Sequence, residues 1–217
     1  MVMAMIPNQA FRPAPLTARD RLLEAGVKLV REQGFSATSV DQLCQHAGVT
    51  KGAFFHHFAS KEALGVALAK YWSDSTGAFF AGAPFHHAEY PVQRVLGYID
   101  LRIALLAGPV ESFSCVAGTM VQEVFLTSEA IRAACEASIM GNAHALEADL
   151  AAAIAQSGAR EVTAAGLARH AQAVIQGAIV LAKAKGGAAA AGVAREELQH
   201  LRRYFAMLFQ QEMTDAG

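Results

Sequence analysis

The chain has 217 residues, a formal net charge of −1, and 53% hydrophobic against 17% charged residues. This composition is typical of a globular protein with a buried core and excludes a disordered chain. Three cysteines without a CxxC pair predict neither a disulfide framework nor a zinc site, so we expect no metal, no cofactor and a reducing, cytoplasmic setting. No apolar run reaches the roughly 18 residues of a membrane span, which predicts no contact with a membrane.

The N-terminal third begins with a proline-containing segment, residues 1–16, which we expect to form a flexible arm. From Thr17, apolar residues recur with helical spacing, and Gly34 is placed to end this first helix with a positive φ. Ser39 and Gln42 then fit a capping box, which predicts a second helix of about two turns.

A third, short helix is predicted from Thr50, a suitable N-cap, to about His57, with Phe54 and Phe58 on its inward face. Ser60 caps a fourth helix. Breaks at Gly, Pro and Ser residues predict five further helices at residues 91–107, 109–126, 128–156, 160–185 and 193–213, with a flexible turn at 186–192. No segment alternates with period two, so the expected fold is all-α with about nine helices.

A helix, a glycine-containing turn and a second helix form the geometry that places the second helix in a DNA major groove. Residues 1–72 also carry eight Lys or Arg against five Asp or Glu, which fits an anionic partner. Small, hydroxyl and basic side chains suit phosphate contact and close approach of the backbone. The residues expected to contact DNA are Thr38, Ser39, Thr50, Lys51, Gly52, Ala53, His56 and Lys61.

The segment TSVDQLCQHAGVTKGAFFHHFASKE, residues 38–62, closely resembles the DNA-binding segment of the tetracycline-repressor (TetR) family of bacterial regulators. The resemblance covers about residues 17–72. It implies a homodimer with a DNA-binding head at residues 17–62 and a ligand-binding and dimerisation body at 63–217. Phe55 stands where this family most often has a tyrosine that donates to phosphate. The resemblance still places Phe55 at the DNA surface, with a loss of about 1 kcal/mol per half-site.

The function that this resemblance implies is a ligand-responsive transcriptional regulator, most often a repressor. It would bind a near-palindromic double-stranded DNA operator and be released by a small-molecule effector. We do not expect an enzyme, because the chain has no GxSxG, Walker, HExxH or GxGxxG motif. The alternatives are a constitutive DNA-binding regulator without an effector, a helical enzyme, and a helical hairpin without a role in DNA binding.

The sequence also offers candidate residues for an effector site. Residues 113–123, FSCVAGTMVQE, resemble a stretch found in one group of these regulators, some of which sense electrophiles through cysteine; the alternative for Cys115 is a buried small hydrophobe. Arg102 lies on an otherwise apolar stripe and needs a partner, either an acidic side chain or a carboxylate ligand. The candidate ligand-binding residues are Tyr98, Arg102, Phe113, Cys115, Met120, Phe125 and Gln176, with core packing as the alternative for the aromatic and Met residues.

The last two helices carry a stripe of small and apolar residues. Two such helices from each of two subunits would form a four-helix bundle, whereas the alternative is a pairing inside one chain. The residues expected at a dimer interface are Ala171, Val174, Ile175, Ala178, Ala182, Leu198, Leu201, Phe205 and Leu208.

Overall fold

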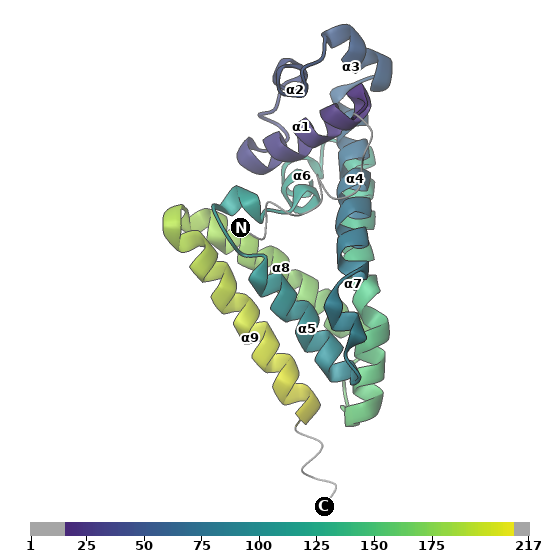
Figure 1. Cartoon of the computed structure of the whole chain (residues 1–217), viewed down its shortest axis with the longest axis vertical. Helices are drawn as coiled ribbons and strands as arrows, with labels where there is room; N and C mark the ends of the chain where they lie inside the picture. The colour runs from purple at the N-terminus through teal and green to yellow at the C-terminus, as the bar shows by residue number, and fades with distance from the viewer. Residues whose placement is uncertain (1–15, 211–217) are drawn as a thin grey trace, which may run out of the picture. The chain divides into compact units, whose positions relative to one another are not determined.

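The computed structural model describes residues 16–210, which form nine α-helices and three short 3-10 helices without any strand (Figure 1). The all-α prediction is therefore confirmed. The arm expected over residues 1–16 lies outside the described residues except for Leu16. No helix within 16–210 is long and apolar enough to cross a membrane. The helices are α1 (Ala18–Gln33), α2 (Val40–Ala47), α3 (Lys51–His57), α4 (Lys61–Ala81), α5 (Pro91–Ala104), α6 (Val116–Val124), α7 (Glu129–Ser157), α8 (Ala164–Lys185) and α9 (Ala190–Gln210).

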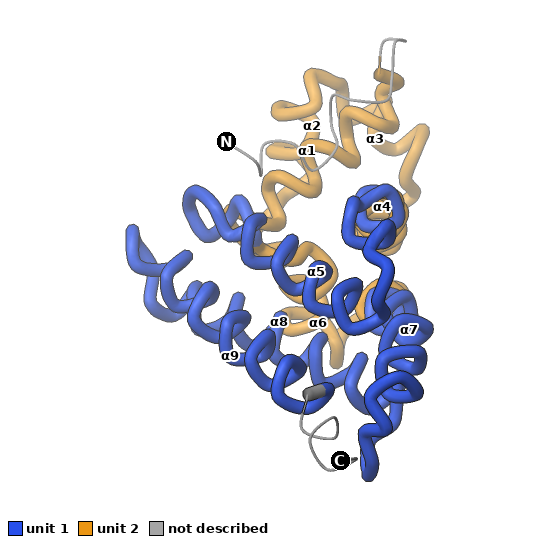
Figure 2. Tube along the Cα trace, turned by 60° about the horizontal axis from the view of Figure 1, so that its bottom comes forward, with its two compact units in different colours: residues 1–3, 79–113, 140–217 blue, residues 4–78, 114–139 orange. Residues whose placement is uncertain are grey.

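The described residues divide into two compact units (Figure 2). We call residues 16–78 with 114–139 the head unit, and residues 79–113 with 140–210 the body unit. The head unit contains α1, α2, α3 and α6, and the body unit contains α5, α8 and α9, while α4 and α7 contribute to both. Because α6 packs on α1, a segment from the middle of the chain belongs to the head unit.

The helices of the head unit begin at side chains that accept hydrogen bonds from the free N–H groups of the first turn. Ser39 accepts from Gln42 N, and the Gln42 side chain accepts from Ser39 N, which completes the predicted capping box. Thr50 Oγ1 accepts from Ala53 N at 3.1 Å, so the predicted cap of α3 is confirmed. Ser60 caps α4 in the same way.

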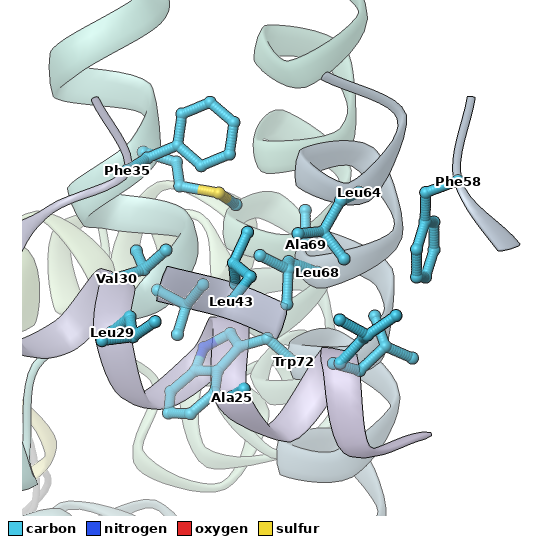
Figure 3. Close-up of a cluster of buried hydrophobic side chains, with 14 of the residues drawn as sticks. Ala25, Leu29, Val30, Phe35, Leu43, Phe58, Leu64, Leu68, Ala69 and Trp72 are labelled. Atoms are coloured by element: carbon cyan, nitrogen blue, oxygen red, sulfur yellow. The ribbon is translucent and has the colours of Figure 1, made fainter. Parts of the chain in front are cut away.

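The core of the head unit collects apolar side chains from α1, α2, α3, α4, α6 and α7. In Figure 3, Leu43 of α2 lies among Leu64 and Leu68 of α4, with Trp72 one turn further along α4. Leu43, Leu64 and Leu68 are almost fully buried. Each such side chain contributes about 1.5–3 kcal/mol through its removal from water, so this core positions the short helices α2 and α3.

The body unit is held by helix packing and by ion pairs between helices. α8 and α9 pack along each other, and α5 packs on α9. Arg94 of α5 lies 2.6 Å from the Asp149 carboxylate of α7, and this pair is largely buried. Arg202 of α9 pairs with Asp100 of α5 at the surface.

Two predicted boundaries in this part of the chain were wrong. The helix expected at 109–126 is a 3-10 turn, Val110–Ser112, followed by α6, which begins at Val116 and ends at Val124. The turn expected at 186–192 is shorter, since α9 already begins at Ala190. The alanines of that run favour helix, and the change of direction needs only Gly186 and Gly187, both with positive φ.

The loop between α1 and α2 depends on Gly34. Its dihedral angles, φ 90° and ψ 163°, fall in a region that is accessible essentially to glycine alone. A Cβ atom at residue 34 would clash with an oxygen of the Glu123 carboxylate on α6, and this carboxylate accepts a hydrogen bond from Ser36 N at 2.7 Å. Gly34 is therefore constrained both by its backbone conformation and by its neighbour.

We expect Gly34→Ala to reduce the free energy of unfolding by clearly more than Gly48→Ala. Gly48 also has a positive φ, 62°, but a Cβ atom there would meet nothing within 4 Å. The control should therefore lose only the cost of a left-handed residue, about 1 kcal/mol. Urea denaturation measures both losses, and equal losses would show that Glu123 does not crowd residue 34.

Candidate nucleic-acid interface

The helix-turn-helix is formed by α2, the turn at residues 48–50, and α3. Gly48 adopts the left-handed conformation, and Val49 N donates to Cys44 O at 3.0 Å, which reverses the chain within this turn. Phe54 of α3 is fully buried and packs against Phe58 with ring centroids 5.9 Å apart. One side of α3 is thus anchored in the core, and the opposite side is left exposed.

The exposed side of α3 carries Lys51, Gly52, Phe55 and His56. A Cβ atom at Gly52 would have only Thr50 Oγ1 nearby, at 3.8 Å, so the start of the helix is open to close approach. The Phe55 ring packs edge-on against Phe54 but keeps 55% of its surface exposed. This side therefore offers one cation, one imidazole, one aromatic ring and little steric bulk at its beginning.

Lys51 forms an exposed ion pair with Asp41 of α2, with 2.8 Å between Nζ and the carboxylate oxygen. The hydrogen bond to Asp41 raises the pKa of Lys51, so this side chain is charged at neutral pH. Because both partners are exposed, the pair is screened by water and contributes little stability. Lys51 can therefore exchange Asp41 for a phosphate at small cost.

Two residues expected to contact phosphate have a different environment. Thr38 is buried, and its hydroxyl donates to Gly34 O at 2.6 Å. Lys61 Nζ donates to Ser36 O at 3.1 Å and lies above the Phe35 ring, and partial burial lowers the pKa of Lys61. These contacts favour a supporting role for both residues in the loop between α1 and α2, in contrast to the expected phosphate contacts.

Arg19 was not predicted as part of this surface. Its guanidinium lies 5.5 Å from the centre of the Phe58 ring, next to the C-terminal end of α3, and the residue is exposed. The only signal in the sequence is a basic residue in the first turn of a helix that precedes the motif. The structure adds Arg19 to the candidate interface.

Two known protein families match two separate segments of the chain. The family profile "Bacterial regulatory proteins, tetR family" matches residues 22–68, and the profile "Transcriptional regulator LmrA/YxaF-like, C-terminal domain" matches residues 91–196. The chain belongs to the TetR family. The first profile ends within α4, and the second begins at the first residue of α5.

The similar TetR-family proteins include named repressors. The HTH-type transcriptional repressor DhaR of Mycobacterium sp. (strain GP1) is 32% identical over 120 residues, which cover 52% of this chain and 56% of DhaR. The HTH-type transcriptional repressor NemR of Escherichia coli (strain K12) is 44% identical over 50 residues, 23% of this chain and 25% of NemR. In each alignment this chain thus spans less than two thirds of the relative.

A solved structure from the same family extends the similarity over most of the chain. The TetR-family regulator from Agrobacterium tumefaciens superposes with a TM-score of 0.71 at 25% identity, and covers 84% of this chain and 96% of that one. The all-α arrangement described above is therefore the TetR-family fold.

The seven candidate ligand-binding residues fall into both units of this TetR-family chain. Tyr98, Arg102, Phe113 and Gln176 belong to the body unit, and the other three belong to the head unit. Arg102 donates two hydrogen bonds to Tyr98 Oη, at 3.1 and 2.9 Å, so these two residues form one cluster. Gln172, one turn before Gln176, was not predicted, yet it is buried with no hydrogen-bond partner for its Oε1 within residues 16–210.

The three head-unit candidates differ in their surroundings. Met120 is fully buried in the core of the head unit, which favours a packing role. Phe125 is 52% exposed. Cys115 is half-buried at the N-terminus of α6, where its sulfur accepts a hydrogen bond from Gly118 N at 3.3 Å.

The other two cysteines are buried. Burial raises the pKa of the Cys135 thiol to about 12, and the neighbouring Cys115 adds to this shift. Burial also raises the pKa of Cys44, in keeping with its place in the head-unit core. Among the described residues, no group of three or more His, Cys, Asp and Glu side chains is arranged to hold a metal ion.

The residues expected at a dimer interface mostly face the inside of the body unit. Ala171, Ala178 and Ala182 of α8 are buried, as are Leu198 and Phe205 of α9. Ile175 and Leu201 are buried as well, whereas Val174 and Leu208 keep part of their surface exposed. The stripe therefore serves the pairing of α8 with α9 within one chain, because these helices pack directly on each other.

We expect Cys115 to react first when the native protein is alkylated with iodoacetamide near pH 8. Only the thiolate reacts, and a thiol that titrates near pH 12 is almost entirely protonated at this pH. Cys44 and Cys135 should react only after unfolding in urea, which serves as the control. Mass spectrometry of peptides measures the order, and faster labelling of Cys135 would contradict its buried environment.

Proposed function

We propose that this TetR-family protein is a transcriptional repressor that binds double-stranded DNA as a homodimer and is released by a small-molecule effector. The observation that carries the proposal is the exposed side of α3, held outward by the burial of Phe54. The relatives DhaR and NemR, both named as HTH-type transcriptional repressors, support the same direction of regulation. No catalytic role is proposed, since the family consists of transcriptional regulators.

The chemistry of the α3 surface supports entry into the major groove. Thr50 and Ser39 are exposed hydroxyls at helix N-termini, where the helix dipole and free N–H groups favour a phosphate. Lys51 and His56 can contact phosphates or base edges, and the Phe55 ring suits a thymine methyl. The proposed DNA-contacting set is therefore Ser39, Thr50, Lys51, Gly52, Ala53, Phe55 and His56, together with Arg19.

The proposed dimer forms through the outer face of α8 and α9. Val180, Leu181, Tyr204 and Met207 of these two helices are large apolar residues that remain exposed in the single chain. A groove of about 380 Å³ on the same helices is lined by Val174, Leu201, Tyr204, Glu197 and two histidines, His170 and His200. A second copy that covers this face would remove its apolar area from water.

The effector response requires two states of the dimer. An effector can release DNA only if it binds the state with low DNA affinity better than the other state. Polar groups of the body unit are candidates for that contact: Arg102 with Tyr98, and Gln172 Oε1, which has no hydrogen-bond partner within residues 16–210. The alternative is a constitutive DNA-binding regulator, whose DNA affinity would not respond to any small molecule.

A second candidate function is electrophile sensing through Cys115. It is favoured by the position of this half-buried thiol at the N-terminus of α6, where its sulfur accepts a hydrogen bond from Gly118 N. In that case alkylation of Cys115 itself, rather than reversible effector binding, would weaken the DNA complex.

We expect Thr50→Ala, Lys51→Ala and His56→Ala each to weaken DNA binding by about five- to tenfold, because each removes a hydrogen bond or a charge at the groove. The DNA is a duplex selected by this protein from a random pool, titrated at fixed salt. Lys51→Ala should also reduce the slope of log affinity against log salt by about one per bound subunit.

Thr38→Ser is the matched control for these variants. As a second control, each α3 variant should keep the mass of the dimer. Thr38→Ser keeps the buried hydroxyl that bonds to Gly34 O, so it should bind DNA like the wild type. Wild-type affinity in all three α3 variants would refute the proposed interface.

We expect Leu181→Glu and Met207→Glu to dissociate the dimer into monomers at micromolar concentration, because each places a carboxylate in the proposed apolar contact. Leu126→Glu is the matched control, since Leu126 is 83% exposed but lies in the turn after α6. Analytical ultracentrifugation gives the mass of each variant. A monomeric wild type would contradict the proposed interface. The interface would also be contradicted if both Leu181→Glu and Met207→Glu remained dimers.

A further inference from the structure

The side chain of Arg102 is the most unusual charge of the body unit. It is half-buried on α5 and, within residues 16–210, no carboxylate lies within ion-pair distance of its guanidinium. Its neighbours are the Phe80 ring, with 4.0 Å between Cζ and the ring centre, and the Tyr98 ring at 5.2 Å. Aromatic rings attract a cation but do not neutralise it.

Three other arginines of the body unit have partners that Arg102 lacks. Arg94, eight residues earlier on α5, pairs with Asp149, and Arg202 pairs with Asp100. Asp100, two residues from Arg102, is therefore already paired with Arg202 of α9. Arg195 of α9 donates to the backbone carbonyl of Leu106. The body unit therefore supplies an acceptor to each of these three arginines, whereas it supplies only a phenol to Arg102.

This arrangement leaves the hydroxyl proton of Tyr98 without an acceptor among the described residues. Tyr98 Oη accepts from both Nε and Nη2 of Arg102. A guanidinium has no acceptor atom, so the Tyr98 proton must point to a third group. Within the described residues no acceptor binds it, and Tyr98 is only 6% exposed. The Nη1 group of Arg102 likewise has no hydrogen-bond partner there.

These groups form an anchored set of donors beside an aromatic wall. Arg102 and Tyr98 supply a positive charge and N–H and O–H donors that are held together by their mutual hydrogen bonds. Phe80 packs against Tyr98 at 5.5 Å between ring centres, and Phe85 packs at 5.9 Å. A carboxylate matches the chemistry of these donors because it accepts from both and cancels the charge, while an apolar group attached to it would pack on the rings.

We propose that Arg102 and Tyr98 bind the carboxylate of an apolar organic acid, and that such an acid is the effector of this protein. The proposal rests on the proposed function in that it gives the class of the small molecule to which the regulator responds. It assigns Arg102 as the residue that selects the charged acid over a neutral molecule of the same shape.

The test measures the melting temperature of the full chain with benzoate and hexanoate, each compared with its neutral amide at the same concentration. We expect at least one acid to raise the melting temperature and neither amide to do so. Arg102→Gln should weaken binding of that acid by at least about tenfold, and Tyr98→Phe by several-fold, as for a lost hydrogen bond to a charge. Arg202→Gln, which removes an exposed ion pair instead, should respond like the wild type.

The melting temperature without ligand separates a binding role from a structural one. Arg102→Gln should lower this melting temperature only moderately, since it loses the hydrogen bonds to Tyr98 and the contact with the Phe80 ring but no ion pair. A lower melting temperature together with a wild-type response to the acid would make Arg102 a structural residue and overturn the proposal. Failure of both acids to stabilise the wild type, or equal stabilisation by the amides, would also overturn it.

Release of DNA distinguishes this proposal from the proposed function. If the acid stabilises the protein through Arg102 but leaves the DNA complex intact, the carboxylate site stands and only its assignment as the effector site fails. If the protein selects no DNA at all, the melting temperature still shows whether Arg102 binds the acid. In that case only the proposed function is refuted.

Discussion

The burial of Phe54 is the interaction on which the candidate interface depends. α3 has only seven residues, far fewer than an isolated helix needs to persist in water. Its stability therefore comes from the burial of Phe54 in the head-unit core. Figure 3 shows Leu43, Leu64 and Leu68 of this core. Because this anchor fixes the rotation of α3, it also determines that Lys51, Phe55 and His56 face outward.

The loop before α2 is held by two charged side chains from the same unit. Glu123 of α6 accepts from Ser36 N, and Lys61 of α4 donates to Ser36 O, so both backbone groups of Ser36 are engaged. Glu62 of α4 in turn accepts from the hydroxyl of Ser128, which caps α7. The position of α2 and α3 is thus tied to α4, α6 and α7 by specific polar contacts as well as by the core.

The sequence was most informative where the signals are local. Ser39, Gly48 and Thr50 define the ends of α2 and α3 through caps and a left-handed turn, and each of these local features is present in the structure. The hydrogen bonds of Thr38 and Lys61 could not be predicted because their acceptors, Gly34 O and Ser36 O, depend on the folded shape of a loop. The pattern marked both as polar residues near the motif but could not show that they bond inward.

The apolar stripe of α8 and α9 shows a second limit of periodicity. Ala178 and Phe205 were predicted at a dimer interface and are buried within the single chain. A stripe does not reveal whether its partner belongs to the same chain or to another. The exposed Leu181 and Met207 stand out only once the inner contacts are known. Met120 was predicted as a ligand-binding residue, and only the fold shows that it lies in the core of the head unit.

Methylation interference on a duplex selected by the protein tests most directly whether α3 enters the major groove twice in one complex. Guanine N7 lies in the major groove, and adenine N3 lies in the minor groove. We expect N7 methylation to block binding in two patches whose centres are about 34–36 Å apart, or a multiple of that distance. A single patch, or interference confined to adenine N3, would contradict the account.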